Sequence, residues 1–386
     1  MKSSKDSSRP KKAPAPTKTA LRIERAKIAV PHPGAVFGHK HYIFIAKLKA
    51  GEIQALNHLS FAAKAAVTPL LEMWPPKKAT KTVSAKPLTQ HTADLMETLS
   101  KEWAGLACYV DTRYLGLGNV PSPAAVSTVF DIARNKNINV VPVTSPFYSQ
   151  PFQQAIRGVI DTDGRGVMFR LPVSIFNDLP NLAGYLGGLA AVLGVTRNQV
   201  DILIDLEHKT NVVEVQQLGA YCLDNLPSVA DWRTVTLASG CFPESLSDKK
   251  SGEWIPFHRA DWVGWCAVVQ QRANASLRVP SYGDYGVRCG GKPNDVPYPP
   301  LPNLRYSSVD TIWARKGLKE AGAMTAICAD LIKRPYFSGA QFSQGDSEIA
   351  QKAAMTNQKN GSPAQWIQWC TNHHLELTAS QILNLP

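Results

Sequence analysis

VDILIDL, at residues 200–206, and NVVPVT, at residues 139–144, are short runs made almost entirely of apolar, mainly β-branched residues. Such continuous runs are typical of β-strands that are buried on both faces, and these occur in parallel sheets covered by helices. The two segments therefore indicate an α/β protein. They also suggest that more strands of the same kind are present along the chain.

Strand-like runs of this kind alternate with stretches of helical spacing from residue 42 onward. The expected strands are residues 42–48, 67–73, 107–111, 138–144, 166–171, 200–206, 234–238 and 276–282. The expected helices are residues 51–59, 88–99, 124–135, 150–159, 174–193, 212–223 and 258–275. Strands that alternate with helices favour a parallel sheet with helices outside it. Eight such units within about 250 residues are typical of a (β/α)8 barrel, which is the fold that we predict.

A doubly wound open sheet is the alternative α/β architecture. It usually carries a glycine-rich phosphate turn after its first strand, whereas this chain continues there with AKLKAGE at residues 46–52. We therefore expect three parts: a disordered basic leader at residues 1–40, a barrel-like domain at 41–282, and a C-terminal elaboration at 283–386. The last part, which opens with a long Gly/Pro-rich loop, is expected to pack on the barrel as a buttress or a lid.

The net charge of +12 is concentrated at the N-terminus. Residues 1–27 hold nine Lys or Arg and two acidic residues, a net charge of +7. A segment this basic and poor in apolar residues is expected to stay disordered. It could add weak, salt-sensitive contact with nucleic acid, or it could simply keep the protein in solution.

The seven cysteines are scattered and form no CxxC pair. This pattern argues against a zinc ribbon or a disulfide framework and favours reduced core residues in a cytoplasmic protein. The N-terminus does not resemble a signal peptide. The longest apolar run is interrupted by glycines and is too short for a membrane span, so no membrane association is expected.

Functional groups of a barrel lie at the C-terminal ends of its strands. The ligand-binding candidates at or near those ends are Lys47, Glu72, Asp111, Arg113, Arg170, Asp205, Glu207, Asp284 and Arg305. Three carboxylates that follow apolar runs, Glu72, Asp111 and Asp205, could together hold Mg²⁺ or Mn²⁺. Lys47, Arg113 and Arg170 could bind an anionic group. The alternative is an ion-pair network that only holds the barrel mouth together.

Other candidates carry less chemical information. His208 could act as an acid or base. His373 and His374 are adjacent, so they point in different directions and are unlikely ligands of one metal ion. Asp284 lies among Tyr282, Tyr285 and Gly283, in a turn that could either grip a ligand or merely pack. Cys241 has no evident histidine partner, and no nucleophile elbow or phosphate loop is present.

Several separated motifs resemble the Beta protein family of phages, phage satellites and bacterial genomic islands. They are YIFIAKLKAGEIQAL (42–56), VTPLLEM (67–73), VPSYGDYG (279–286), LRYSS (304–308), PYFSGAQFSQGDSEI (335–349) and TNHHLE (371–376). The resemblance implies a mobile-element context and a role in phage defence or in a toxin–antidote arrangement. It implies no catalytic residues.

Two functional hypotheses follow. The first is an interaction protein of a defence or toxin–antidote cassette, whose barrel mouth recognises a protein from the same cassette or from a phage. It is motivated by the resemblance and by the absence of a catalytic signature. The second is a metal-dependent hydrolase that acts on a phosphoester or nucleic acid, motivated by the charged strand ends.

Overall fold

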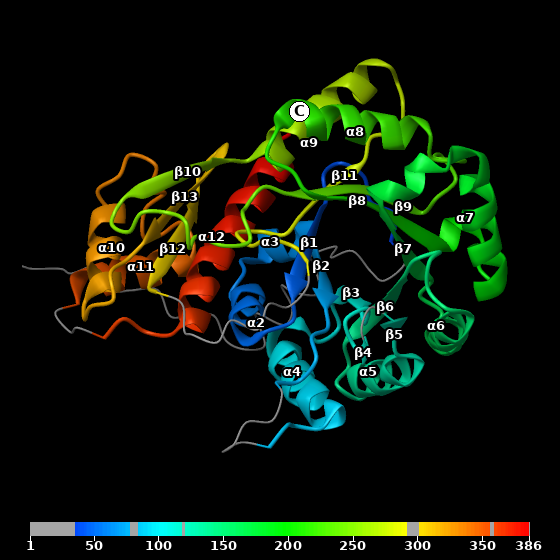
Figure 1. Cartoon of the computed structure of the whole chain (residues 1–386), viewed down its shortest axis with the longest axis horizontal. Helices are drawn as coiled ribbons and strands as arrows, with labels where there is room; N and C mark the ends of the chain where they lie inside the picture. Colours follow the sequence, from blue (N-terminus) through cyan, green and yellow to red (C-terminus); the bar gives the residue numbers. More distant parts are fainter. Residues whose placement is uncertain (1–34, 78–83, 118–119, 292–300, 356–358, 386) are drawn as a thin grey trace, which may run out of the picture.

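The computed structural model describes residues 35–77, 84–117, 120–291, 301–355 and 359–385 (Figure 1). Eight parallel strands form a closed barrel in the order β1-β11-β9-β8-β7-β6-β3-β2. They are β1 Tyr42–Lys47, β2 Val67–Glu72, β3 Ala107–Asp111, β6 Asn139–Thr144, β7 Val167–Pro172, β8 Val200–His208, β9 Thr234–Gly240 and β11 Ser281–Asp284. The predicted (β/α)8 barrel is confirmed. The predicted leader at residues 1–40 falls almost entirely outside the described residues.

Helices surround the barrel (Figure 1). They are α2 Ala50–Asn57, α3 Phe61–Ala66, α4 Leu88–Trp103, α5 Pro123–Asn135, α6 Gln150–Asp163, α7 Leu179–Leu193, α8 Val212–Asp224 and α9 Ala260–Asn274. Short 3-10 helices, η1 Val173–Asn177 and η2 Arg197–Gln199, precede α7 and β8. A small hairpin of β4 Gly116–Leu117 and β5 Val120–Pro121 follows β3.

Local sequence explains these helices. In α4 the buried residues Thr92, Met96, Leu99 and Trp103 recur every three or four positions, so they form one apolar stripe that faces the sheet. The helix α5 begins at Pro123, and the hydroxyl of Ser122 accepts a hydrogen bond from the backbone of Ala125. A capping hydroxyl followed by proline is a favoured helix start, since it satisfies a free N–H and presets the backbone angle.

One expectation about the last barrel unit was wrong in detail, and one strand near it was not predicted. The final strand begins at Ser281 rather than at residue 276, because Pro280, which has no N–H to donate, directly precedes it. In addition, β10 Trp254–His258, which lies before this strand in the sequence, leaves the barrel. It joins β12 Asn303–Ser307 and β13 Thr311–Lys316 in a separate antiparallel sheet of order β10-β13-β12.

We use the term C-terminal unit for this sheet together with α10 Ala323–Leu331 and α11 Gln344–Ala354. The unit has its own apolar core. The long helix α12 Pro363–Leu383 joins the two cores, because Trp366 and Trp369 pack in the C-terminal unit while Leu375 and Ile382 pack on the barrel. Since α12 lies against β1, α2 and α3, it fills the place of the last helix around the barrel.

Candidate functional site

Side chains of the barrel strands alternate between the inside and the outside of the barrel, because successive residues of a strand point to opposite faces. The interior core contains Ile45, Leu70, Tyr109, Met168 and Leu203. The residues two positions further along these five strands therefore form the top layer inside the barrel. They are Lys47, Glu72, Asp111, Arg170 and Asp205, five of the residues that the sequence singled out.

Arg170 lies at the centre of this layer and binds three carboxylates. Its Nε and Nη2 donate to Oδ2 of Asp205 at 2.9 and 2.7 Å. Its Nη1 donates to Oε1 of Glu72 at 2.9 Å and to Oδ2 of Asp111 at 3.0 Å. The hydroxyl of Tyr285 lies 2.8 Å from Arg170 Nη2 and 2.6 Å from Asp205 Oδ2. We call these residues the Arg170 network.

Arg113, from the loop after β3, completes the Arg170 network from above. Its Nη2 donates to Oε1 of Glu72 at 2.6 Å, and its backbone N–H donates to Oδ1 of Asp111 at 3.0 Å. One carboxylate oxygen stays unused: Oε2 of Glu72 is buried and accepts no hydrogen bond from the described residues. Glu72 therefore retains one acceptor site at the barrel mouth.

The network favours the charged forms of Asp205 and Arg170. Burial raises the pKa of the Asp205 carboxyl, but the guanidinium groups of Arg170 and Arg113 outweigh this effect and hold the pKa below its usual value. Burial alone would lower the pKa of Arg170, yet nearby Asp205, Glu72 and Asp111 keep it raised. All three carboxylates are therefore bound to arginine as a fixed ion-pair network.

This arrangement bears on the hypothesis of a Mg²⁺ or Mn²⁺ site at Glu72, Asp111 and Asp205. The three carboxylates do meet, but they meet around a guanidinium, which occupies the place between them. In the part of the chain that the structure describes, no group of three or more His, Cys, Asp or Glu side chains is placed to hold a metal ion. The residues as arranged thus do not fit a resident divalent cation.

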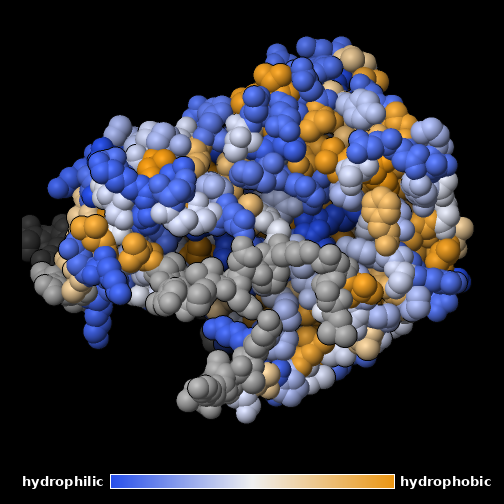
Figure 2. Space-filling view, in the orientation of Figure 1, coloured by the Kyte–Doolittle hydropathy of each residue, from blue (hydrophilic) through white to orange (hydrophobic). Residues whose placement is uncertain are grey.

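Above the network the barrel mouth opens into a cleft with a volume of about 1360 Å³. The cleft is lined by residues that follow β1 to β3, by residues of β12 and by the first turn of α12. In Figure 2 hydrophilic side chains gather near the centre of the face that is viewed. Aromatic residues also line the cleft: Trp74, Tyr114, Tyr148, Tyr285 and Trp366.

The aromatic wall is interleaved with cations. Lys49 Nζ lies 4.3 Å and Lys47 Nζ 4.7 Å from the ring centroid of Trp74. Trp74 in turn lies 5.5 Å from the ring of Tyr114, and the guanidinium of Arg113 lies 4.7 Å from that same ring. Cations held against ring faces gain electrostatic stabilisation. This wall is therefore ordered before any ligand binds.

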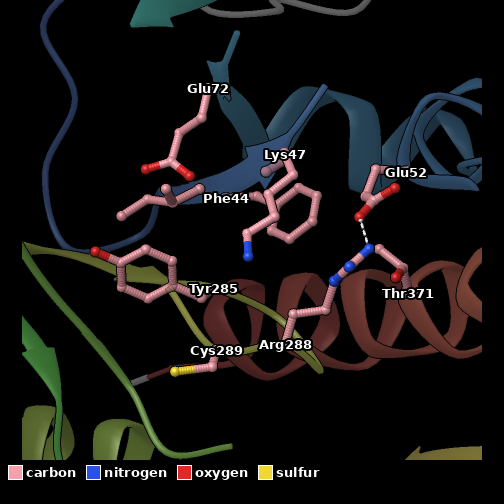
Figure 3. A pocket seen from close by; sticks show the side chains of 10 residues that line it. Phe44, Lys47, Glu52, Glu72, Tyr285, Arg288, Cys289 and Thr371 are labelled. Carbon is pink, nitrogen blue, oxygen red and sulfur yellow. Dashed lines mark hydrogen bonds and ion pairs between the residues drawn. The ribbon is translucent and has the colours of Figure 1, made fainter. Parts of the chain in front are cut away.

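A small cavity at the side of the mouth contains the amino group of Lys47. Figure 3 shows the amino group of Lys47 in the space between Glu72, Tyr285 and Arg288, while the guanidinium of Arg288 points toward Glu52. Arg288 forms an ion pair with the buried Glu52, whereas Lys47 has no ion-pair partner within the described residues. Burial, followed by the charge of Arg288, lowers the pKa of Lys47 to about 8.

Glu207 and His208 lie at the rim of the cleft, at the end of β8. Glu207 has a φ of 62° and sits in a bulge between Asp205 and His208. The left-handed backbone region is uncommon for residues with a β-carbon, and bulges often redirect side chains next to functional sites. The side chains of both residues are exposed on the rim. Arg305, on β12, also lines the cleft.

Asp284 lies in a different environment from the other candidates. It is in strand β11 rather than in a turn, and it points out of the barrel toward α12. Its carboxylate accepts hydrogen bonds from Tyr42, from Tyr282 at 2.9 Å and from the backbone of Gly286 at 2.8 Å, and it lies 2.9 Å from Nε2 of His374. Asp284 is fully buried and does not line the cleft.

The two adjacent histidines have separate partners, because successive residues of a helix point in different directions. His374 lies between Asp284 and the hydroxyl of Ser307, whose oxygen is 2.7 Å from its Nδ1. His373 lies between Asp346, at 2.8 Å, and the backbone oxygen of Ser307, at 2.8 Å. Both histidines are fully buried, so these contacts join α12 to the barrel and to the C-terminal unit. Cys241 is likewise a buried free thiol.

Sequence reasoning missed three residues of the mouth, Glu52, Trp74 and Tyr114, and it did not pair Arg288 with Glu52. Trp74 lies one position beyond the predicted second strand, where barrel loops begin, and that position was a usable signal. Glu52 and Arg288 are 236 positions apart and meet only because α2 and the loop after β11 adjoin in the closed barrel.

The fold and the site define a (β/α)8 barrel protein with an arginine-centred ion-pair network beneath a wide cleft. The chain belongs to the Beta protein family, whose model matches residues 42–379. No curated protein matched the chain. Among the described residues, no helix combines the length and the apolar composition that a membrane crossing requires.

Two solved structures resemble the chain only distantly. An active domain of a chitinase from Pyrococcus furiosus is 12% identical, with 65% of this chain and 85% of that chain covered and a TM-score of 0.37. A pyruvate carboxylase from Rhizobium etli is 11% identical, with 90% and 29% covered and a TM-score of 0.35. Likenesses at this level carry no argument about function.

Proposed function

We propose that the chain is a recognition protein that binds a polypeptide segment in the cleft at its barrel mouth. The observation that carries the proposal is the cleft itself, about 1360 Å³ in volume and continuous from the barrel to α12. Pockets for small molecules usually measure about 300–1,000 Å³. A cleft larger than that range, with exposed rim residues, favours an extended chain as its occupant.

The composition of the cleft supports the same proposal. Tryptophan, tyrosine and arginine are enriched among the residues that dominate binding energy at protein interfaces. All three are present here, as Trp74, Tyr114, Trp366, Arg113 and Arg305. Because cation–ring contacts already order part of this wall, its side chains would lose less conformational entropy when a partner binds.

The metal-dependent hydrolase hypothesis receives less support. Each of its three carboxylates is engaged by Arg170, so metal binding would first require the guanidinium to leave. The resemblance to the Beta protein family supplies the biological setting of the proposal. We expect the partner to be encoded in the same mobile-element cassette or by a phage.

A substitution that obstructs the cleft tests the proposal. Ala364 is an exposed residue of α12 that lines the cleft, so Ala364→Trp would obstruct it. Ala191, an exposed alanine on α7 outside the cleft, provides the matched control Ala191→Trp. Each full-length variant is expressed with the neighbouring genes of its cassette, purified, and analysed for stoichiometric partners by mass spectrometry.

We expect one partner to be recovered with the wild type and with Ala191→Trp, and to be lost with Ala364→Trp. Equal recovery with both tryptophan variants would place the binding surface outside the cleft. Recovery of a divalent metal or a phosphoester with the wild type, without a protein, would favour the hydrolase instead.

A further inference from the structure

Three cations gather at one side of the cleft with two carboxylates beside them, Glu52 and Glu72, and Glu72 is already paired with Arg113 and Arg170. Lys47 and Arg288 share the small cavity of Figure 3, and Arg288 and Arg305 line the adjoining wall of the cleft. Arg305 Nη1 donates to the backbone oxygen of Val287 at 2.8 Å, which holds its guanidinium next to Arg288. Glu52 is bound to Arg288 and balances one of the three charges.

Burial and the repulsion between these cations both lower the pKa values of Lys47 and Arg305. Burial, then the charge of Arg288, lowers the pKa of Arg305 to about 10. The same two causes, in the same order, lower the pKa of Lys47 to about 8. A bound anion would offset both effects, because an opposite charge nearby favours the protonated form.

A second feature of the same cavity calls for a hydrogen-bond donor. Oε2 of Glu72 is buried, lines the cavity with Lys47, and has no donor among the described residues. A buried carboxylate oxygen without a partner is costly, so a ligand that supplies a donor would be favoured. The cavity itself measures only about 10 Å³, which is room for a water-sized donor. A larger anion would therefore bind at its opening, where Arg288 also lines the cleft.

We infer that Lys47, Arg288 and Arg305 form a carboxylate subsite, and that the polypeptide bound in the cleft is acidic. Here the anion is the carboxylate of an Asp or Glu residue or of a chain end, bound at the opening of the small cavity. A phosphodiester backbone carries a negative charge on every unit and would also face the carboxylates of Asp205 and Glu207 in the cleft. This inference rests on the proposed function and specifies the chemistry of its partner.

Fluorescence anisotropy on the full-length protein tests the inference with two labelled peptides, hexaglutamate and hexaglutamine, both capped at their ends. The variants are Lys47→Met and Arg305→Met, with Lys47→Arg retaining the charge. Lys250→Met is the matched control, since Lys250 is an exposed lysine outside the cleft. The basic residues 1–27 are the same in every variant, so differences between variants isolate the subsite.

We expect Lys47→Met and Arg305→Met each to weaken hexaglutamate binding about tenfold relative to Lys250→Met. Hexaglutamine should bind weakly to all variants. Between pH 7 and 9 the wild type should lose affinity for hexaglutamate as Lys47 loses its proton, while Lys47→Arg should retain its affinity. Equal binding of both peptides, or equal effects of Lys47→Met and Lys250→Met, would overturn the inference.

A labelled twelve-residue oligothymidine provides a third probe. If it binds more tightly than hexaglutamate and responds to the same substitutions, the subsite takes phosphate and the inference is wrong. The proposed function has a separate outcome: a partner that Ala364→Trp displaces, but that Lys47→Met does not, would preserve polypeptide binding while overturning the carboxylate subsite.

Discussion

Arg170 on β7 donates two hydrogen bonds, from Nε and Nη2, to one carboxylate oxygen of Asp205 on the neighbouring strand β8. The same guanidinium reaches Glu72 on β2 and Asp111 on β3, across the mouth of the barrel. One side chain thus ties together four strands. This relationship explains how three carboxylates of like charge can lie close together.

The first prediction concerns Arg170→Met. The substitution keeps much of the volume but leaves Glu72, Asp111 and Asp205 buried with fewer partners. Removing one partner of a buried ion pair typically costs about 3–5 kcal/mol, so the free energy of unfolding in urea should fall by that order. Arg157→Met, which removes an exposed ion pair with Asp161, should cost about 1 kcal/mol or less. Similar losses for both variants would contradict a central role for Arg170.

The second prediction concerns pH and His41, which is buried below β1 with Nε2 2.9 Å from the hydroxyl of Thr68. Burial lowers its pKa from 6.5 to about 3, so the folded protein holds this ring neutral. A lowered pKa means that the unfolded chain binds more protons between pH 6.5 and 3, and this contribution to stability is lost as the pH falls through that window.

The measurement is the free energy of unfolding of the wild type and of His41→Gln between pH 8 and 4. Below pH 6.5 the wild type should lose stability more steeply, by up to about 1.4 kcal/mol per pH unit. Above pH 7 the difference in the free energy of unfolding between the two proteins should not change with pH. Parallel curves over the whole range would show that His41 is protonated in the folded state.

The third prediction concerns Ser307, His374 and Asp284, whose contacts resemble those of a hydrolytic triad. All three side chains are fully buried, so no substrate can reach the serine hydroxyl. A fluorophosphonate reagent should therefore leave Ser307 unlabelled in the folded protein. His374→Ala should instead lower stability by about 1–3 kcal/mol, since it leaves buried polar groups unpaired. Stoichiometric labelling that His374→Ala abolishes would reveal a working nucleophile.

The fourth prediction concerns residues 1–27, which lie outside the described residues and carry a net charge of +7. Deleting them should weaken binding to duplex DNA and make that binding less dependent on salt, because fewer counterions are released. The measurement is a salt series of DNA affinity for the full chain and the deletion variant. If affinity and salt dependence are unchanged, the tail makes no such contact.

The sequence predicted the barrel well because each buried strand carries its own apolar signal and the helices between them have regular spacing. It also predicted which residues form the top layer, since Glu72, Asp111 and Asp205 each end an apolar run. The position of Arg170 among these carboxylates depends on the curvature of the closed sheet, which brings β7 within reach of β2 across the barrel mouth. No local pattern carries that information.

The C-terminal region was less predictable for a similar reason. The helix α12 completes the ring of barrel helices although 78 residues separate its first residue, Pro363, from Asp284 at the end of β11. The strand β10 pairs with β13, which lies beyond the last barrel strand in the sequence. Asp284 was placed in a turn because the glycines around it suggest one, whereas the strand continues through Gly283.

The most direct test of polypeptide binding in the cleft is site-specific photocrosslinking in cells. A benzophenone amino acid is placed at position 364, on the cleft wall, or at position 191, on the exposed face of α7. Cells that carry the whole cassette, or that are infected by phage, are irradiated, and the adducts are identified by mass spectrometry. The account predicts one defined protein adduct at position 364 and none at position 191. The same adducts at both positions, or none at position 364 while a partner still copurifies, would contradict it.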